Sequence, residues 1–346
     1  MALPEITLEQ LQESGHKYRA DLVRLPVLGL ERSTRFMTVR MGVRYKETLF
    51  SPEFNAELQA YKSAERQNAS GDFIPRTLET EFAACFFDFD PNTIISSLYG
   101  HAASQAGQGA VSTPGAREVA GSVLKNIGKG LNLHLFDAKK DKTQKTTATL
   151  FDGFDTIVEK EIADGNISVA KGNLYVADKP ITAQNAGDIL KAALFAASDE
   201  LREEETLLFC SRAIADAYNE NYLLTHQGIN YNTQYSQPYL EGSDNLCTFA
   251  PVAGKKGSKY LFLTTKSNML VGVDQMSDTE RVEFNKYEPK VVTGELYMFI
   301  GVNFESVDPR RLLVIQLADD SKEPAKDPDQ NKGDGGQEAG GQEAGG

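Results

Sequence analysis

The residues of this chain that could do chemistry are few and widely spaced. Asp88 and Asp90, in the run FFDFDPN, could bind a cation or act as a carboxylate pair. Two neighbouring carboxyl groups can divide the acid and base roles of an active site between them. The Pro91 that follows instead favours a turn in which Asp side chains accept hydrogen bonds from the backbone. We interpret the pair as a turn and keep a carboxylate-dependent hydrolase as an alternative.

The sequence also lacks the metal-ligand and nucleophile motifs that would indicate an enzyme. The histidines are widely separated, and none lies in HExxH or beside a cysteine pair: His16, His101, His134 and His226. The cysteines form no CxxC, and their apolar surroundings indicate buried reduced thiols: Cys85, Cys210 and Cys247. No GxSxG, P-loop or dinucleotide fingerprint occurs. The sequence therefore predicts no catalytic residue, no cofactor, no metal site and no enzymatic activity.

Composition limits the partners of the chain. Its 346 residues carry a formal net charge of −13, which argues against a general nucleic-acid or acidic-membrane binder, because those proteins use a basic surface. The start, MALPEITLEQLQESG, has acidic residues where a signal peptide needs a basic region and an apolar run. No stretch approaches the roughly 18 apolar residues of a membrane span. We expect synthesis in the cytoplasm and no membrane partner.

Three tyrosines recur at every fourth position in the run GINYNTQYSQPYLEG: Tyr231, Tyr235 and Tyr239. Tyrosine is enriched at protein interfaces, so these side chains are candidates for contact between subunits. An internally packed loop is the alternative interpretation.

Two segments alternate as half-buried strands do. In Arg35–Arg44, one face carries Met37, Val39, Met41 and Val43. In Thr77–Phe87, one face carries Leu78, Phe82, Ala84 and Phe86. The opposite faces carry charges that could pair across the strands or across a subunit contact: Arg40, Arg44, Glu79 and Glu81. The long polar excursion between these apparent partner strands, residues 45–76, indicates a binding loop or an arm.

The rest of the chain alternates helices and strands. Helical spacing predicts helices from Pro114, from Phe154 to Ala163, from Ala186, and after a Ser211 cap. Short buried strands are predicted at Thr206–Cys210, within Gly257–Asp274, and at Val291–Val302 and Leu312–Leu317. This order is typical of a mixed α+β domain. After residue 318, a Gly-rich tail holds eight acidic residues and three lysines, and its composition predicts disorder.

The order of these elements resembles that of the major capsid proteins of tailed bacteriophages, which share the Hong Kong 97-like fold. Three phrases are also similar: FDGFDTIVEKEIADGNI (Phe151–Ile167), ETLLFCSRAIADAY (Glu205–Tyr218) and KYLFLTTKSNMLVGVD. The resemblance implies an N-terminal arm at residues 1–31, an E-loop hairpin with adjoining strands at 32–100, and a peripheral domain at 101–185 with a spine helix at 114–133. It further implies an axial domain at 186–290 and returning peripheral strands at 291–318, before the tail at 319–346.

The resemblance implies a structural protein that assembles itself, as hexamers and pentamers, into an icosahedral shell around phage double-stranded DNA. Implied partners are scaffolding and portal proteins and DNA bound without sequence specificity; the implied location is the virion, after assembly in the bacterial cytoplasm. Some relatives are crosslinked between a loop lysine and an asparagine, but no motif near Lys46 or Lys62 identifies a partner. The short N-terminus implies a mature form or a separate scaffolding protein. An encapsulin-like compartment and another virion component, such as a tail or decoration protein, are the alternatives.

Overall fold

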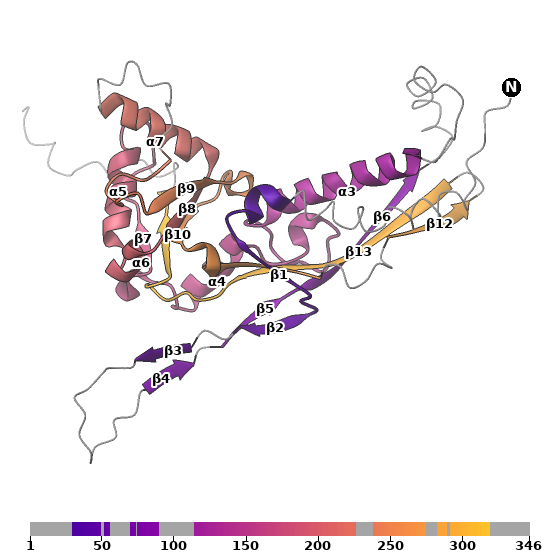
Figure 1. Cartoon of the computed structure of the whole chain (residues 1–346), viewed down its shortest axis with the longest axis horizontal. Coiled ribbons are helices and arrows are strands. Elements are labelled where there is room, and N and C mark those ends of the chain that lie inside the picture. Colours follow the sequence, from indigo (N-terminus) through magenta and orange to yellow (C-terminus); the bar gives the residue numbers. More distant parts are fainter. Residues whose placement is uncertain are drawn as a thin grey trace, which may run out of the picture.

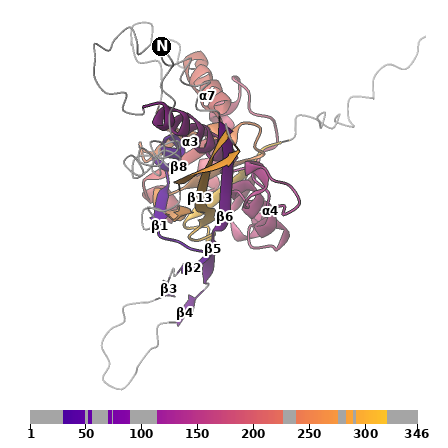
Figure 2. The same cartoon turned by 90° about the vertical axis from the view of Figure 1, so that its right-hand side faces the viewer.

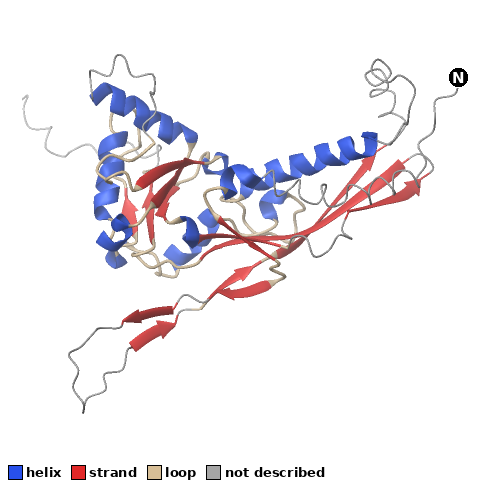
Figure 3. Cartoon of the chain, viewed as in Figure 1, coloured by secondary structure: helices blue, strands red, loops and turns tan. Residues whose placement is uncertain are grey.

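The computed structural model describes residues 30–49, 52–55, 70–73, 75–89, 114–225, 238–274, 282–288 and 291–318. Within these ranges, two five-stranded sheets follow one another along the long axis, and a hairpin projects from one of them (Figures 1 and 3). Helices flank both sheets, so the fold is the α+β type that the sequence predicts.

The first sheet is built around β13 (Val291–Phe304). Its other strands are β1 (Thr38–Met41), β6 (Glu81–Phe89), β11 (Met269–Val273) and β12 (Val282–Glu288). Strand β13 pairs antiparallel with β6, β11 and β12, whereas β1 pairs parallel with β11. The β6–β13 ladder runs from Phe89 opposite Val292 to Glu81 opposite Ile300. This long ladder gives the molecule its extended shape.

The second sheet has the order β7, β14, β10, β8, β9. Its strands are β7 (Leu174–Val176), β8 (Thr206–Cys210), β9 (Cys247–Pro251), β10 (Tyr260–Thr264) and β14 (Leu312–Gln316). Three helices accompany it: α5 (Ala186–Ala196), α6 (Asp199–Glu203) and α7 (Arg212–Thr225). Because side chains of a strand alternate between faces, Leu261 and Leu263 of β10 pack with the helices, while Phe262 joins the other core.

The remaining helices pack beside the first sheet, except for one short 3-10 helix, at residues 169–171, that contacts β7 of the second sheet. They are α3 (Pro114–His134), α4 (Phe154–Ala163) and the short 3-10 helices η1 (Thr147–Thr149), η2 (Val169–Lys171), η3 (Ala253–Lys255) and η4 (Lys266–Asn268). Local signals explain their bounds: α4 begins after Gly153 and is followed by Gly165 in the left-handed region at φ 73°. The amide of Ile214 bonds the Ser211 side chain, which is the cap predicted for α7.

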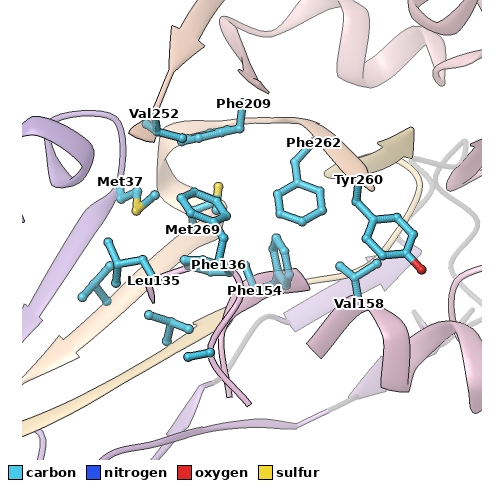
Figure 4. Close-up of a cluster of buried hydrophobic side chains, with 14 of the residues drawn as sticks. Met37, Leu135, Phe136, Phe154, Val158, Phe209, Val252, Tyr260, Phe262 and Met269 are labelled. Carbon is cyan, nitrogen blue, oxygen red and sulfur yellow. The ribbon is translucent and has the colours of Figure 1, made fainter. Parts of the chain in front are cut away.

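Aromatic rings fill the core where the two sheets meet (Figure 4). The Phe136 and Phe154 rings lie 5.5 Å apart, and Phe304 lies 5.0 Å from Phe154 and 5.5 Å from Phe262. These rings come from both sheets and from the helices between them. Burial of one such ring stabilises the folded protein by about 2–3 kcal/mol. Because rings from both sheets pack together here, this core holds the two sheets to one another.

Two connections cross between the sheets, and a single buried side chain links them. The chain passes from β10 to β11 through η4, and from β13 to β14 through residues 305–311. Asn268, which is fully buried, donates to the Thr264 hydroxyl at 2.9 Å and to the Arg311 carbonyl at 3.3 Å. Its own side-chain oxygen accepts from the Ser306 amide at 2.7 Å. Both connections are therefore fixed to one another through Asn268.

A long hairpin leaves the first sheet. Near the body, β2 (Lys46–Leu49) pairs with β5 (Arg76–Glu79), and beyond it β3 (Pro52–Asn55) pairs with β4 (Ser70–Phe73). Both views show the hairpin leaving on the side of the sheet away from α3 (Figures 1 and 2). It lies within residues 32–100, the range that the capsid resemblance implies for an E-loop hairpin with its adjoining strands.

Two sequence interpretations of this region are wrong. The segments 35–44 and 77–87 are not partners: β1 pairs with β11, and β6 pairs with β13. Strand β1 ends at Met41, which is 57% exposed, because Gly42 turns the chain at φ 82°. The segment 77–87 is also two strands, divided at Thr80. Leu78 is buried before that break, whereas Phe82 is 50% exposed after it.

Candidate subunit-contact surface

The β6–β13 ladder has one covered face and one exposed face. On the covered face, Leu296 and Ile300 are buried, and Cys85 is half-buried. A groove of about 750 Å³ runs between this face and α3, lined there by Ile127 and Leu131. The side chains of the next residues in each strand point to the opposite face, where α3 does not reach.

The exposed face carries a cluster of aromatic rings, which we call the aromatic face: Tyr45, Phe82, Phe86 and the half-buried Tyr297, packed on Phe299, which is itself buried. Phe82 stacks on Tyr297 at 5.6 Å with an interplanar angle of 2°, and Phe86 meets Tyr297 edge-on at 6.1 Å. Phe86 is 61% exposed and Tyr45 65% exposed. Contiguous exposed rings of this kind are uncommon on monomeric proteins and mark contact sites.

Polar groups border the aromatic face. The Tyr297 hydroxyl donates to a Glu295 carboxylate oxygen at 2.8 Å. The Thr293 hydroxyl donates to Asp88 at 2.6 Å. An apolar centre with a polar rim is the usual composition of a protein–protein interface.

Of the four charged candidates, Arg40, Arg44 and Glu79 lie near the base of the hairpin, whereas Glu81 lies on the covered face of β6, and they do not pair as the sequence suggested. Arg40 lies 3.7 Å from Glu47, and the Arg44 Nε lies 2.9 Å from Asp274. Glu79 pairs with Lys46 at 2.5 Å, and Glu81 pairs with Lys140. The β2–β5 pairing places Lys46 directly opposite Glu79, and this pairing could not be foreseen from the alternation pattern. Their role as interface residues stays a prediction.

The tyrosine candidates are only partly within the described residues. Tyr231 and Tyr235 lie outside them. Tyr239 is 37% exposed and forms an isolated antiparallel bridge with Thr248 of β9. Tyr239 therefore lies beside the second sheet, apart from the β6–β13 ladder, and its contact role also stays a prediction.

Arg76, which the sequence analysis missed, anchors the hairpin to the body. Its Nε donates to the Phe304 carbonyl at 3.2 Å, and its Nη2 lies 2.6 Å from Glu161 and 3.3 Å from the Asn303 side-chain oxygen. Asn303 in turn donates to the Thr77 carbonyl at 2.8 Å. The partners lie far along the chain, so no local sequence signal could have revealed them.

Two glycines let the hairpin cross the first sheet closely. Gly272 of β11 and Gly301 of β13 are directly paired in the ladder. A β-carbon added to Gly301 would lie 1.9 Å from the Glu79 carbonyl oxygen. One added to Gly272 would lie 2.9 Å from the Thr80 side chain. Side chains at this pair would push β5 away from the sheet.

A buried ion pair joins η3 to α4. The Lys255 Nζ lies 2.5 Å from Asp155 and 2.8 Å from the Tyr260 carbonyl, and it sits 3.4 Å from the centroid of the Phe262 ring. Burial lowers the pKa of Lys255 to about 8, while Asp155 opposes that shift. The neighbouring Gly254 packs on the end of α3, where an added β-carbon would lie 2.8 Å from the Leu133 carbonyl oxygen. Together, the ion pair and the close contact of Gly254 hold α3, α4 and the second sheet against one another.

The described residues offer little for catalysis. Among them, no group of three or more His, Cys, Asp or Glu side chains is placed to hold a metal ion. Burial raises the pKa of Cys210 and of Cys247 to about 12, so neither thiol is an activated nucleophile. Burial also raises the pKa of Cys85. Asp90, the proposed partner of Asp88, lies outside the described residues.

Comparison with known proteins finds the same fold in capsids. A chain of the satellite phage P4 procapsid including the size determination (Sid) protein matches with a TM-score of 0.56 and 10% identity, over 92% of each chain. The capsid of the native GTA particle gives 0.54 at 12% identity, over 84% of this chain and 90% of that one. The cyanophage A-1(L) capsid gives 0.51 at 12% identity, over 85% and 92%. No protein-family model and no curated protein matches the sequence.

These matches define the class of fold. Sequence identities of 10–12% relate the chains by architecture, and the coverage includes most of each chain. The chain has the Hong Kong 97-like capsid fold, as the sequence analysis expected. Within the described ranges, no helix combines the length and apolar composition of a membrane span.

Proposed function

We propose that this protein is a major capsid protein, which assembles itself into an icosahedral shell enclosing phage double-stranded DNA. The aromatic face carries the proposal beyond the fold. Its exposed rings would lower the solubility of an isolated subunit, and contact with a neighbouring subunit would remove those rings from water. A role as a structural protein without enzymatic activity is part of the proposal.

The hairpin supports the same conclusion. Two-stranded hairpins are at best marginally stable in water when nothing packs against them. The β3–β4 pair lies beyond the base of the hairpin and away from both sheets (Figures 1 and 2). A neighbouring subunit can supply the surface that the hairpin needs. Repetition of these modest contacts around symmetry axes would stabilise a closed shell.

The finer assignments belong to the same proposal. The hairpin would be the E-loop, α3 the spine helix of a peripheral domain, and the second sheet with α5–α7 the axial domain. Scaffolding and portal proteins would be partners during assembly in the bacterial cytoplasm, and the virion would be the final location. The approximate boundaries remain those given by the sequence analysis.

Electron microscopy of the purified full-length protein at high concentration, with and without a scaffolding partner, tests the proposal. Closed particles, or rings of five and six subunits, are the expected result. A protein that stays monomeric by sedimentation under every condition would contradict it. Particles filled with enzyme instead of DNA would favour a cellular compartment.

A further inference from the structure

The groove between α3 and the β6–β13 ladder reaches the outer edge of β6. Six consecutive residues of β6, from Glu81 to Phe86, line this groove. Side chains of a strand alternate between its two faces, so a groove over one face alone would be lined by every second residue. Among the described residues, β6 pairs only with β13. The backbone amides and carbonyls along the other edge of β6 therefore border the groove.

This edge of β6 has the properties of a site for an added strand. The sequence of β6, EFAACFFDF, is mostly apolar and contains no proline or lysine, and its ladder with β13 continues without a bulge. Proteins use those features to prevent the edge of a sheet from pairing with another chain. An extended segment can instead bind such an edge through backbone hydrogen bonds, while its alternate side chains enter the adjoining groove.

The lining of the groove indicates the chemistry of that segment. Apolar side chains come from the sheet and from α3: Cys85, Leu296, Met298, Ile127 and Leu131. The loop that follows α3 contributes Lys142 and Lys145, which are both exposed. Lys140 of the same loop pairs with Glu81, but within the described ranges neither Lys142 nor Lys145 has a carboxylate at ion-pair distance. The groove therefore fits a strand that carries apolar and acidic side chains in alternation.

The start of this chain has that pattern. In the run EITLE, residues 5–9, Ile6 and Leu8 would point to one side of an extended strand. Glu5 and Glu9 would point to the other side. The first 15 residues contain three glutamates and no lysine or arginine, so this segment complements the lysines of the groove in charge.

The same segment can reach the groove of its own subunit. Leu30, the first described residue, belongs to the same buried cluster as Leu131, which lines the groove. The chain from residue 9 to residue 30 spans up to about 70 Å at roughly 3.3 Å per residue. By comparison, the 21-residue helix α3 is only about 30 Å long. Attachment through a linker of this kind raises the local concentration of the segment to the millimolar range.

We propose that residues 5–9 add a strand to the outer edge of β6 within the same subunit. The two apolar residues of the segment would pack on the apolar lining, and its two glutamates would lie within reach of Lys142 and Lys145. The added strand would occupy the backbone groups along the edge of β6 and so prevent two subunits from pairing through them. This proposal goes beyond the proposed function and does not rest on it.

Alkylation of Cys85 tests the proposal, because Cys85 lines the groove whereas Cys210 and Cys247 are fully buried. The full-length protein is treated with N-ethylmaleimide, and mass spectrometry follows the rate at each cysteine. Ile6→Ser combined with Leu8→Ser should raise the Cys85 rate several-fold. The matched control, Leu22→Ser combined with Val23→Ser, should not. Slow modification of the two buried cysteines shows that each variant is folded, and an unchanged Cys85 rate in the first variant would overturn the proposal.

Charge exchange tests the contact between the segment and the lysines. The Cys85 rate should rise in each of two double variants: Lys142→Glu with Lys145→Glu, and Glu5→Lys with Glu9→Lys. New negative charge near a thiol favours its protonated form and slows alkylation, so a faster rate in the lysine variant cannot come from the local field. The protein with all four changes should return towards the parent rate, and no recovery would contradict the pairing.

Two further measurements identify other occupants of the groove. A strand from the same subunit protects Cys85 equally at every protein concentration. Protection that disappears on dilution would assign the groove to a second copy and overturn the proposal. Changing the acidic residues after residue 318 to their amides should leave the Cys85 rate unchanged, and an increase would assign the groove to the tail instead. These measurements use the unassembled subunit, so their failure is distinct from a failure to form shells.

Discussion

The Lys255–Asp155 pair has very different expected effects when both members are replaced together and when one is removed alone. The double change Lys255→Met with Asp155→Leu replaces two buried charges with apolar side chains of similar length. That change should alter the free energy of unfolding by less than about 1 kcal/mol, since desolvation offsets most of the attraction in a buried ion pair. Asp155→Ala leaves the ammonium unpaired and should cost about 3 kcal/mol. Urea denaturation measures both, and equal losses would contradict this account.

The same lysine predicts a pH dependence. Its pKa is about 8 in the folded protein, against 10.5 for the ordinary side chain. The unfolded chain therefore binds more protons between these two values, so this residue's contribution to stability rises with pH across that window. The gain from about pH 8 to 10 should be about 2 kcal/mol. The free energy of unfolding of the parent protein and of Lys255→Met, measured at both pH values, isolates the contribution of Lys255. The same change with pH in both proteins would refute it.

Gly301 is the second residue with a sharp expectation. In Gly301→Ala the new methyl group would meet the Glu79 carbonyl oxygen, which belongs to the backbone and cannot rotate away. We expect a loss of about 3 kcal/mol or displacement of β5. Gly165→Ala is the control, because its surroundings are open and only its φ of 73° is strained. Thermal unfolding would report the loss of stability, and amide exchange at Leu78 would report displacement of β5. If Gly301→Ala changes neither quantity, the close crossing of β5 over Gly301 is contradicted.

At the scale of elements, the hairpin depends on Arg76. Arg76→Ala removes the bonds to Phe304, Glu161 and Asn303 and leaves Glu161, which is mostly buried, without this partner. We expect amide exchange across the β2–β5 pair to accelerate at least tenfold, with little change in β10. The control is Arg40→Ala, since its pair with Glu47 is 3.7 Å long and exposed and such pairs contribute under about 1 kcal/mol. Equal acceleration in both variants would show that Arg76 is not the anchor.

Local elements could be predicted from the sequence where local signals decide them. Helix α4 has the predicted bounds, Phe154–Ala163, because a capping glycine and a left-handed glycine frame an apolar stripe. Strands β8 and β13 start where alternation and β-branched residues predicted them. The break at Thr80 was missed because Leu78, Phe82 and Phe86 keep the same alternation across it. Only the structure, in which the chain at the end of β5 crosses over the Gly272–Gly301 pair before β6 joins β13, shows that Leu78 faces a different side from Phe82 and Phe86.

The contacts that position the candidate surface could not be predicted. Arg76 and Asn303 are 227 positions apart, and Lys255 and Asp155 are 100 apart. Neither pair has a motif, since each depends on how two sheets and a hairpin meet. Asn268 lies within Gly257–Asp274, where the sequence predicted only short buried strands, yet it links both crossings between the sheets. By contrast, the order of elements was enough to suggest the fold.

At the scale of the whole molecule, the aromatic face should govern association without governing folding. Phe86→Ser should change subunit stability by less than about 1 kcal/mol, because the ring is 61% exposed. The change should remove about 1.4 kcal/mol or more of the free energy of contact between subunits. The protein concentration needed for assembly should therefore rise at least tenfold. The control is Val169→Ser, at a 63% exposed position on η2. Sedimentation and microscopy compare the two, and normal shells from Phe86→Ser would remove this face from the interface.

Asn268 has a consequence for curvature. A closed icosahedral shell bends more sharply at its fivefold vertices than across its flat facets, so identical subunits must meet at more than one angle. Because one buried amide holds both crossings, and the aromatic core fills the space beside them, the two sheets resist rotation relative to each other. Each subunit would then behave as a stiff wedge. In the proposed shell, differences in bending would be absorbed where the hairpin joins the first sheet, and not between the two sheets.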